Sequence, residues 1–277
     1  MDYLENCPAE ISESIKIFID RFRKKNKDFF GSNILIRDDI FSILEKKAVV
    51  VFFPLLDEEN DGFHVKRTVN GEQKDFVYIN TAKAVEKQVF TAAHELGHQL
   101  CIEDYITKNC PTFNSKKYSE NIVNRFAATL LIPEDELNKI VAIKLKELKQ
   151  TTSVDNVTLT FTEAIKLIVF LMDYFFVPFK TVVYRLSEVE IVSVQIRNTI
   201  LKNYNQSLLN ECIEEGKYLK LNKPNNKKSI AGYSELLDQA EQLESFPLQK
   251  VEKIRKQFDI PEIEVSKKIN LKLTVKA

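Results

Sequence analysis

Hydrophobic residues in the first part of the chain switch between helical and strand spacing. Residues 9–30 have a mixed helical pattern, and residues 37–46 form a second short helical stretch after the break at 31–33. Residues 48–53 are then continuously apolar up to Pro54, which indicates a buried strand, and 62–67 and 75–80 are its expected neighbours. This order predicts a small, largely antiparallel sheet.

Two helices are predicted directly after the sheet. Residues 89–98 combine small and apolar positions that suit a buried helix, and residues 119–133 carry a helical apolar stripe that ends at Pro133. A sheet that precedes packed helices in this way is typical of an α+β fold.

The second half of the chain is predicted to be mainly helical. Helical periodicity continues through residue 148, a polar loop follows at 151–158, and three helices at 161–175, 178–186 and 192–202 resemble a helix-turn-helix in their spacing. Beyond a basic, asparagine-rich segment at 219–228, which we expect to be an exposed linker, come helices at 233–245 and 249–258 and a final strand at 269–275. We therefore expect three regions, residues 1–150, 151–205 and 206–277.

Composition bounds the function classes. The chain has 277 residues, 44% of them hydrophobic, and its 40 basic and 40 acidic residues cancel, so no global field attracts nucleic acid or anionic lipid. Because Lys180 and Arg185 give the helix-turn-helix-like segment only a thin basic footprint, substrate docking or core support is favoured there over DNA reading.

Three features indicate the compartment. The first residues lack the pattern of a secretory signal, Lys166 and Asp173 interrupt the most apolar stretch, and the four cysteines include no close C-x-x-C pair. The sequence predicts a cytoplasmic protein with reduced thiols and no membrane span.

The strongest chemical signal is the motif His94-Glu95-Leu96-Gly97-His98. Histidines four residues apart lie on one helix face, so both imidazoles can bind one metal ion while Glu95 reaches the bound water. A catalytic zinc ion usually takes three protein ligands and leaves one position to water. The motif therefore predicts a zinc hydrolase with a third ligand elsewhere.

Glu120 and Asn124 share a face of the next predicted helix. One of them can bind the metal while the other accepts a hydrogen bond from a ligating histidine. Cys101 also falls on the motif's helix face, but a buried thiol that packs as a small hydrophobe is favoured over a ligand. His64 lies in a predicted strand and is not expected to bind the metal.

The chain resembles a known family over segments 78–81, 90–98 and 120–133. Together with the motif, the sequence Glu-x-x-Val-Asn-Arg-Phe-Ala-Ala from Glu120 is similar to the ImmA/IrrE-type metallopeptidases. The resemblance implies a zincin-like core, one zinc ion held by His94, His98 and Glu120, and a cytoplasmic endopeptidase that cleaves a helix-turn-helix repressor. On this interpretation Glu95 is the general base and Asn124 orients a histidine.

Two other classes of function stay open. The chain could be a regulatory protein that keeps the metal for structure and sequesters its partner, or a zinc hydrolase of a non-protein bond. The presence of Glu95 favours an enzyme, since a closed structural zinc site needs no general base. No oxyanion donor is assigned among the chemically capable side chains, Tyr78, Tyr118, Tyr184 and Arg125.

Overall fold

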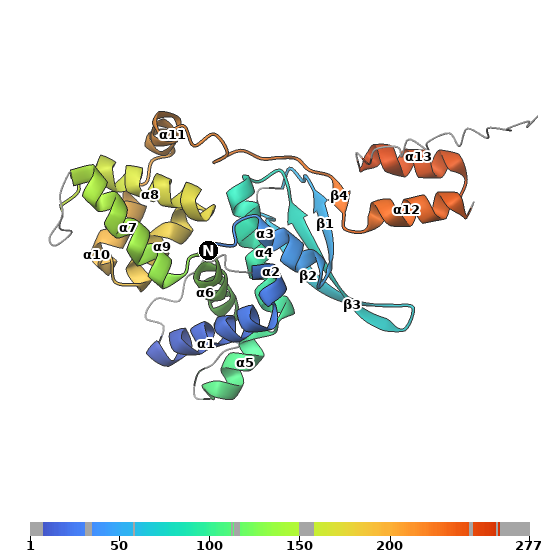
Figure 1. Cartoon of the computed structure of the whole chain (residues 1–277), viewed down its shortest axis with the longest axis horizontal. Helices are drawn as coiled ribbons and strands as arrows, with labels where there is room; N and C mark the ends of the chain where they lie inside the picture. Colours follow the sequence, from blue (N-terminus) through green and yellow to red (C-terminus); the bar gives the residue numbers. More distant parts are fainter. Residues whose placement is uncertain are drawn as a thin grey trace, which may run out of the picture.

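The computed structural model describes residues 8–30, 35–57, 59–111, 113, 117–149, 158–243, 246–258 and 260. A four-stranded sheet lies between the main group of helices on one side and the helices α12 (Tyr233–Gln242) and α13 (Leu248–Gln257) on the other (Figure 1). Its strands are β1 (Val49–Phe53), β2 (Gly62–Val69), β3 (Glu72–Asn80) and β4 (Ser229–Ile230), in the spatial order β2-β3-β1-β4.

The sheet is mixed, which corrects the prediction of a largely antiparallel one. β2 and β3 form an antiparallel hairpin, and Asn70 and Gly71 at its tip both have positive φ angles, as a tight two-residue turn requires. β3 then inserts between β2 and β1 and pairs with β1 in parallel, Val49 opposite Phe76. The segment after β1 must therefore cross to the edge position before the hairpin begins.

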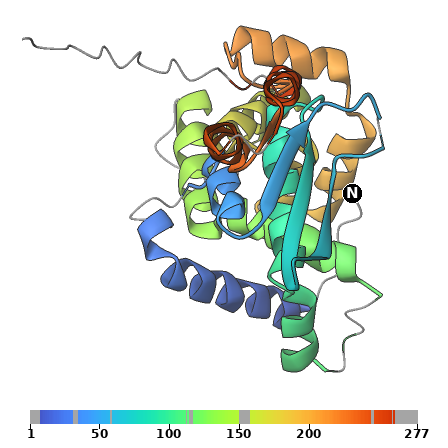
Figure 2. The same ribbon diagram turned by 90° about the vertical axis from the view of Figure 1, so that its right-hand side faces the viewer.

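Helix α4 (Val85–Gln99) packs across one face of this sheet (Figure 2). Val77 and Ile79 alternate along β3 and are fully buried in the shared core. At Gly62 an added Cβ would lie 2.5 Å from a side-chain carbon of Thr91, so the edge strand β2 and α4 approach closely there. The helix α4, which carries His94 and His98, thus packs against the sheet edge formed by β2.

The helices on the other side of α4 build most of the remaining core. α6 (Ser119–Leu131) packs on α4, and α5 (Ile102–Asn109) and α1 (Ala9–Lys25) pack together and on α6. α1 buries Ile11, Ile15, Ile19 and Phe22, the spacing of one helix face. The short helices α2 (Lys27–Phe30) and α3 (Asp39–Glu45) follow α1, and α3 contacts both α4 and β1.

A helical group follows α6. It consists of α7 (Glu134–Lys149), α8 (Phe161–Phe175), α9 (Phe179–Glu188), α10 (Val194–Lys202) and α11 (Gln206–Glu215). The three helices predicted from the pattern correspond to α8, α9 and α10, and α11 was not predicted. No single described helix meets the length and hydropathy needed to cross a membrane; α8 and α9 meet them only as a pair bent by 101°.

The segment 219–228 is mostly exposed, as the sequence predicted for a linker, but its backbone is also bound to the sheet domain. The backbone N–H of Asn226 donates to Thr81 at 3.0 Å, the Thr81 hydroxyl donates to Lys227 at 2.7 Å, and β4 follows at once beside β1. The composition of the segment cannot predict these backbone contacts, because its side chains are mostly exposed and polar.

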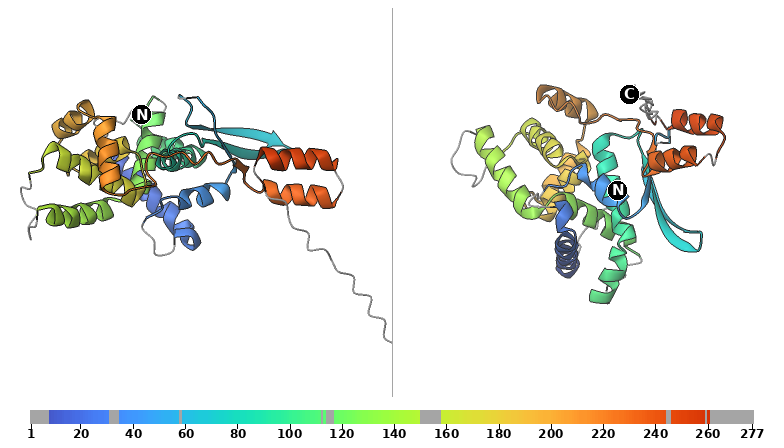
Figure 3. Two further views of the ribbon diagram at one scale, coloured as in Figure 1. Left: turned by 90° about the horizontal axis from the view of Figure 1, so that it is seen from above. Right: turned by 45° about the vertical axis from the view of Figure 1, so that its right-hand side comes forward.

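The two predicted C-terminal helices are present as α12 (Tyr233–Gln242) and α13 (Leu248–Gln257). They form a hairpin that projects from the sheet side of the molecule in both views of Figure 3. Phe258 connects this hairpin to the sheet, since its ring lies 5.5 Å from Tyr233 and 6.2 Å from Phe53. The strand predicted at 269–275 lies outside the described residues.

Candidate functional site

Two packed helices carry the residues of the predicted metal site. α4 presents His94 and His98 one turn apart, and α6 presents Glu120 in its first turn. Gly97 allows the helices to approach, because a Cβ there would lie 2.9 Å from side-chain carbons of both Val123 and Phe126. The glycine inside the motif therefore has a packing role between the two helices.

The three side chains converge on one point. His94 Nε2 and His98 Nε2 lie 3.1 Å apart, and the Glu120 carboxylate oxygens lie 3.3 Å from the first and 3.5 Å from the second. Ligand atoms about 2.1 Å from a tetrahedral zinc ion lie about 3.4 Å from one another. The donor types and their spacing therefore fit a zinc ion, and among the described residues these three form a group that could hold a metal.

Each histidine is oriented through its other ring nitrogen. His94 Nδ1 lies 2.9 Å from the side-chain oxygen of Asn124, and His98 Nδ1 lies 3.0 Å from a carboxylate oxygen of Glu103. An Nδ1–H donated to such an acceptor leaves the Nε2 lone pair free for a metal. Asn124 thus lies where the face of α6 predicts it.

Glu103 is a site residue that the sequence analysis missed. It belongs to α5, and Ser119 Oγ donates a second hydrogen bond to the same carboxylate oxygen at 2.8 Å. Cys101 turns the chain from α4 into α5 with a left-handed conformation, φ 53°, which brings Glu103 back toward His98. Neither helical spacing nor a motif marks this contact in the sequence.

The charges of the cluster reinforce one another. Burial lowers the pKa of His98, but the hydrogen bond to Glu103 and the nearby carboxylates outweigh it and hold that pKa above its usual value. Burial raises the pKa of Glu103, yet its bonds from His98 and Ser119 bring it below the usual range. The contact with His94 likewise lowers the pKa of Glu120.

Glu95 lies on the wall of a cavity of about 360 Å³ that also contains His94 and Glu120. Its side chain is buried, and burial raises its pKa against the opposing effect of the two histidines. The cavity is lined by Glu59, Asp61, Gly62, Phe90, Thr91, His94, Glu95, Glu120 and Asn124. A buried carboxyl beside a metal-binding cluster has the position that a general base requires.

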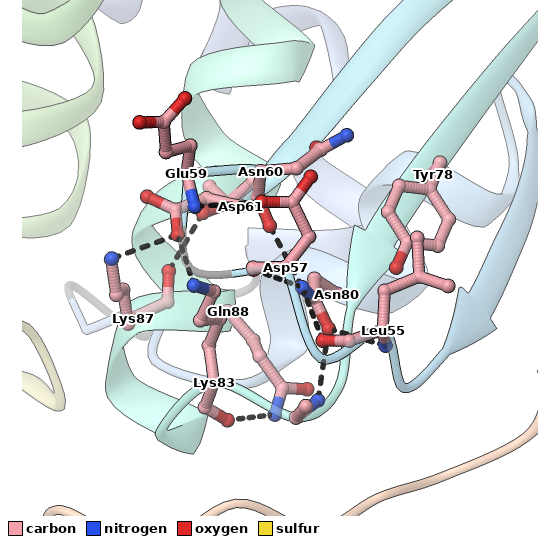
Figure 4. Close-up of polar contacts among 12 residues, drawn as sticks. Leu55, Asp57, Glu59, Asn60, Asp61, Tyr78, Asn80, Lys83, Lys87 and Gln88 are labelled. Carbon is pink, nitrogen blue, oxygen red and sulfur yellow. Dashed lines mark hydrogen bonds and ion pairs between the residues drawn. The ribbon is translucent and has the colours of Figure 1, made fainter.

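The loop after β1 forms one wall of this cavity, and Asn80 fixes its shape (Figure 4). The Asn80 amide donates to the carbonyls of Leu55 and Asn60 at 3.1 and 2.8 Å, and its oxygen accepts from the Leu55 N–H at 3.0 Å. At the end of the loop, the Asp61 carboxylate pairs with Lys87 at 2.8 Å. The loop is thereby attached both to β3 and to the first turn of α4.

The remaining candidates from the sequence have other roles. Cys101 is outside the metal-binding group, and His64 pairs with Asp75 at 2.6 Å across the β2–β3 hairpin. The Tyr78 hydroxyl donates to Phe53 at 2.8 Å, and burial raises the pKa of Tyr78 to about 12. The four side chains considered as oxyanion donors are absent from the lining of the metal cavity.

No curated protein matches this chain. A solved structure of a Mycobacterium tuberculosis transcriptional regulator is similar at 17% identity and a TM-score of 0.38, over 65% of this chain and 52% of that one. This chain therefore spans about half the length of that protein.

The match to a protein family is more extensive. Residues 44–187 match Peptidase_M78, the IrrE N-terminal-like domain, which is slightly more than half of the chain and includes the whole metal-binding cluster. We conclude that the chain belongs to the Peptidase_M78 family of metallopeptidases.

Proposed function

We propose that this protein is a zinc-dependent endopeptidase that cleaves a regulatory protein, a helix-turn-helix transcriptional repressor. The observation that carries the proposal is the convergence of His94, His98 and Glu120, together with the buried Glu95 in the wall of the cavity that His94 and Glu120 line. The repressor as substrate rests on the resemblance to ImmA/IrrE-type peptidases and on membership of their family. The cytoplasm is the compartment consistent with this substrate.

The roles of the residues follow from their positions. A zinc ion held by His94, His98 and Glu120 would lower the pKa of its bound water and polarise the scissile carbonyl. Glu95 accepts the proton of the attacking water and then delivers it to the leaving amine. Asn124 and Glu103 keep both Nε2 lone pairs directed at the same point.

The sheet edge offers a docking mode for the substrate. β2 is an edge strand, and Gly62 at its start lines the metal cavity. An extended peptide that adds to this edge would be aligned by main-chain hydrogen bonds, with its scissile bond next to the cluster. A crystal structure with a substrate peptide bound away from β2 would contradict this mode.

The first experiment measures zinc per chain by elemental analysis. We expect about one zinc ion in wild type and in Glu95→Gln, and loss of zinc in His98→Ala and Glu120→Ala, because only the last two remove a ligand. A wild-type protein without zinc after metal-replete preparation would refute the metallopeptidase proposal.

The second experiment measures cleavage of a small helix-turn-helix repressor chosen as a candidate substrate. Wild type should cleave it, whereas Glu95→Gln should retain zinc and lose cleavage, because the proton acceptor is gone. Undiminished cleavage by Glu95→Gln would end the assignment of Glu95. A repressor that is bound tightly but never cut would instead favour sequestration.

A further inference from the structure

A second cavity, of about 390 Å³, adjoins the metal cavity. Asp61 lines both cavities. The other walls come from the first turn of α4, the α8–α9 turn, the start of α11 and Asn222 in the 219–228 segment. Its volume is within the range of about 300–1,000 Å³ that is usual for ligand pockets.

Glu86 is the unusual residue in this cavity wall. Its side chain is only 4% exposed; one carboxylate oxygen accepts from the Asn222 N–H at 2.9 Å, and the other has no partner among the described residues. Burial raises the pKa of Glu86 against two opposing backbone hydrogen bonds. A buried carboxylate oxygen without a donor is costly, and a turn of this carboxyl group toward the cavity that Glu86 lines would let a bound donor satisfy it.

The other charged side chains that line this cavity do not neutralise the carboxylate of Glu86. Lys87 is paired with Asp61 at 2.8 Å, and no ion pair of Glu86 occurs in the described part of the chain. Lys180 is exposed to water, which solvates its charge. The missing partner is therefore a cation or a strong hydrogen-bond donor.

Apolar side chains complete the cavity. Met172, Phe179 and Leu209 line it and can cover the aliphatic stem of a long basic side chain. Arginine and lysine combine such a stem with a charged donor group at the tip. The lining and the unpartnered carboxylate together match this chemistry better than that of an anionic or purely apolar group.

Helix geometry gives the separation of Glu86 and His94 along the axis of α4. Glu86 precedes His94 by eight residues on α4, which is about 12 Å along the axis at about 1.5 Å per residue. An extended peptide covers this distance in three to four residues at about 3.3 Å each. A substrate on the cluster can therefore reach this cavity with a nearby side chain.

We propose that the cavity lined by Glu86 is a subsite for an arginine or lysine side chain of the substrate, three or four residues from the scissile bond. The substrate position assigned to this subsite rests on the proposed peptidase function, whereas the affinity of the cavity for a basic group does not. DNA-binding proteins are rich in such residues, so this subsite would suit the proposed repressor substrate.

The binding test uses small probes and needs neither zinc nor catalysis. N-acetyl-arginine methylamide and its norleucine analogue are titrated into the full chain, with and without chelator, and binding is followed by ligand-observed NMR. Wild type should bind the arginine probe and not the norleucine probe, and Glu86→Gln should bind it about tenfold more weakly, because the charge-assisted hydrogen bond is lost.

Two variants control this test. Glu211→Gln, an exposed change on α11, should leave binding unchanged, and Lys180→Glu should tighten it, because a cation is replaced by an anion at the wall. Thermal melts of each variant verify folding. Equal binding of the arginine probe by wild type and Glu86→Gln, or preference for an N-acetyl-aspartate methylamide probe, would overturn the proposal.

The cleavage test determines which position of the substrate the subsite binds. The zinc-loaded protein is incubated with a peptide library rich in internal arginine and lysine, and cut sites are identified by mass spectrometry. Basic residues should be enriched three or four positions from the cut by wild type and not by Glu86→Gln. Cleavage without such enrichment overturns the assigned substrate position. If the library is not cleaved but the arginine probe is bound, only the peptidase function is contradicted.

Discussion

Gly97→Ala tests whether close contact of α4 and α6 builds the metal site. A Cβ at position 97 would lie 2.9 Å from side-chain carbons of Val123 and Phe126, closer than real Cβ contacts come. Both neighbours are fully buried, so neither can turn out of the way into solvent. The substitution should push α6, and with it Glu120, away from the two histidines.

Two opposing effects decide the sign of the stability change. Alanine favours a helix interior over glycine by about 1 kcal/mol, whereas one extra methyl group in a packed core costs about 1–3 kcal/mol. With two contacts below 3.0 Å the packing cost should exceed the gain, for a net loss of about 1 kcal/mol. In a protein of this size that lowers the melting temperature by about 2–4 °C.

The assay combines urea unfolding in chelator with zinc competition titration. Gly97→Ala should be less stable without metal and should also bind zinc more weakly, because its third ligand is displaced. Val123→Ala provides the control, because it removes one of the two contacted carbons. The losses of stability in Gly97→Ala and in Val123→Ala should therefore add up to more than the loss in the double variant. A Gly97→Ala protein that is more stable than wild type, with unchanged zinc affinity, would refute the packing argument.

Three further predictions concern the surroundings of the site. Glu103→Ala should weaken zinc binding about 10- to 100-fold in a chelator competition, because His98 loses the acceptor that orients it; unchanged affinity would contradict this role. A chain ended after residue 218 should melt lower and aggregate more than one ended after 232, because it exposes the edge of β1; equal behaviour in melts and light scattering would argue against it. The bond from Lys16 lowers the pKa of Glu134 below 4.5, so this pair stabilises the fold above that pH and loses its effect as the pH falls through the lowered pKa; the stability difference between wild type and Lys16→Ala, at most about 1 kcal/mol, should vanish in acid urea titrations.

Residues close in sequence were the ones that could be predicted. The spacing of His94 and His98, and that of Glu120 and Asn124, fixes a shared helix face, and the structure brings these four side chains together. The positions of β1, β2, β3 and most of the helices followed from the same periodicities, whereas α5, α11 and β4 did not. These features depend only on the local repeat of the backbone.

Contacts that depend on a turn or on distant pairing could not be predicted. Glu103 reaches His98 only because Cys101 adopts a left-handed conformation that residues other than glycine rarely take. β4 has two residues, too few to show alternation, and its partner β1 lies far away in the sequence. Asn222 and Glu86 are 136 positions apart, so only the fold reveals that the Asn222 backbone binds this buried carboxylate.

The pairing of β4 also limits where a substrate can join the sheet. β4 covers part of the outer edge of β1, whereas β2 forms the opposite edge of the described sheet. Gly62 at the start of β2 lines the metal cavity, and Asp61 just before it lines both this cavity and the Glu86 cavity. A peptide on the β2 edge would therefore lie next to the cluster and to the proposed Glu86 subsite. Because Asn222 precedes β4 and binds Glu86, the segment that covers one sheet edge also shapes the subsite near the other.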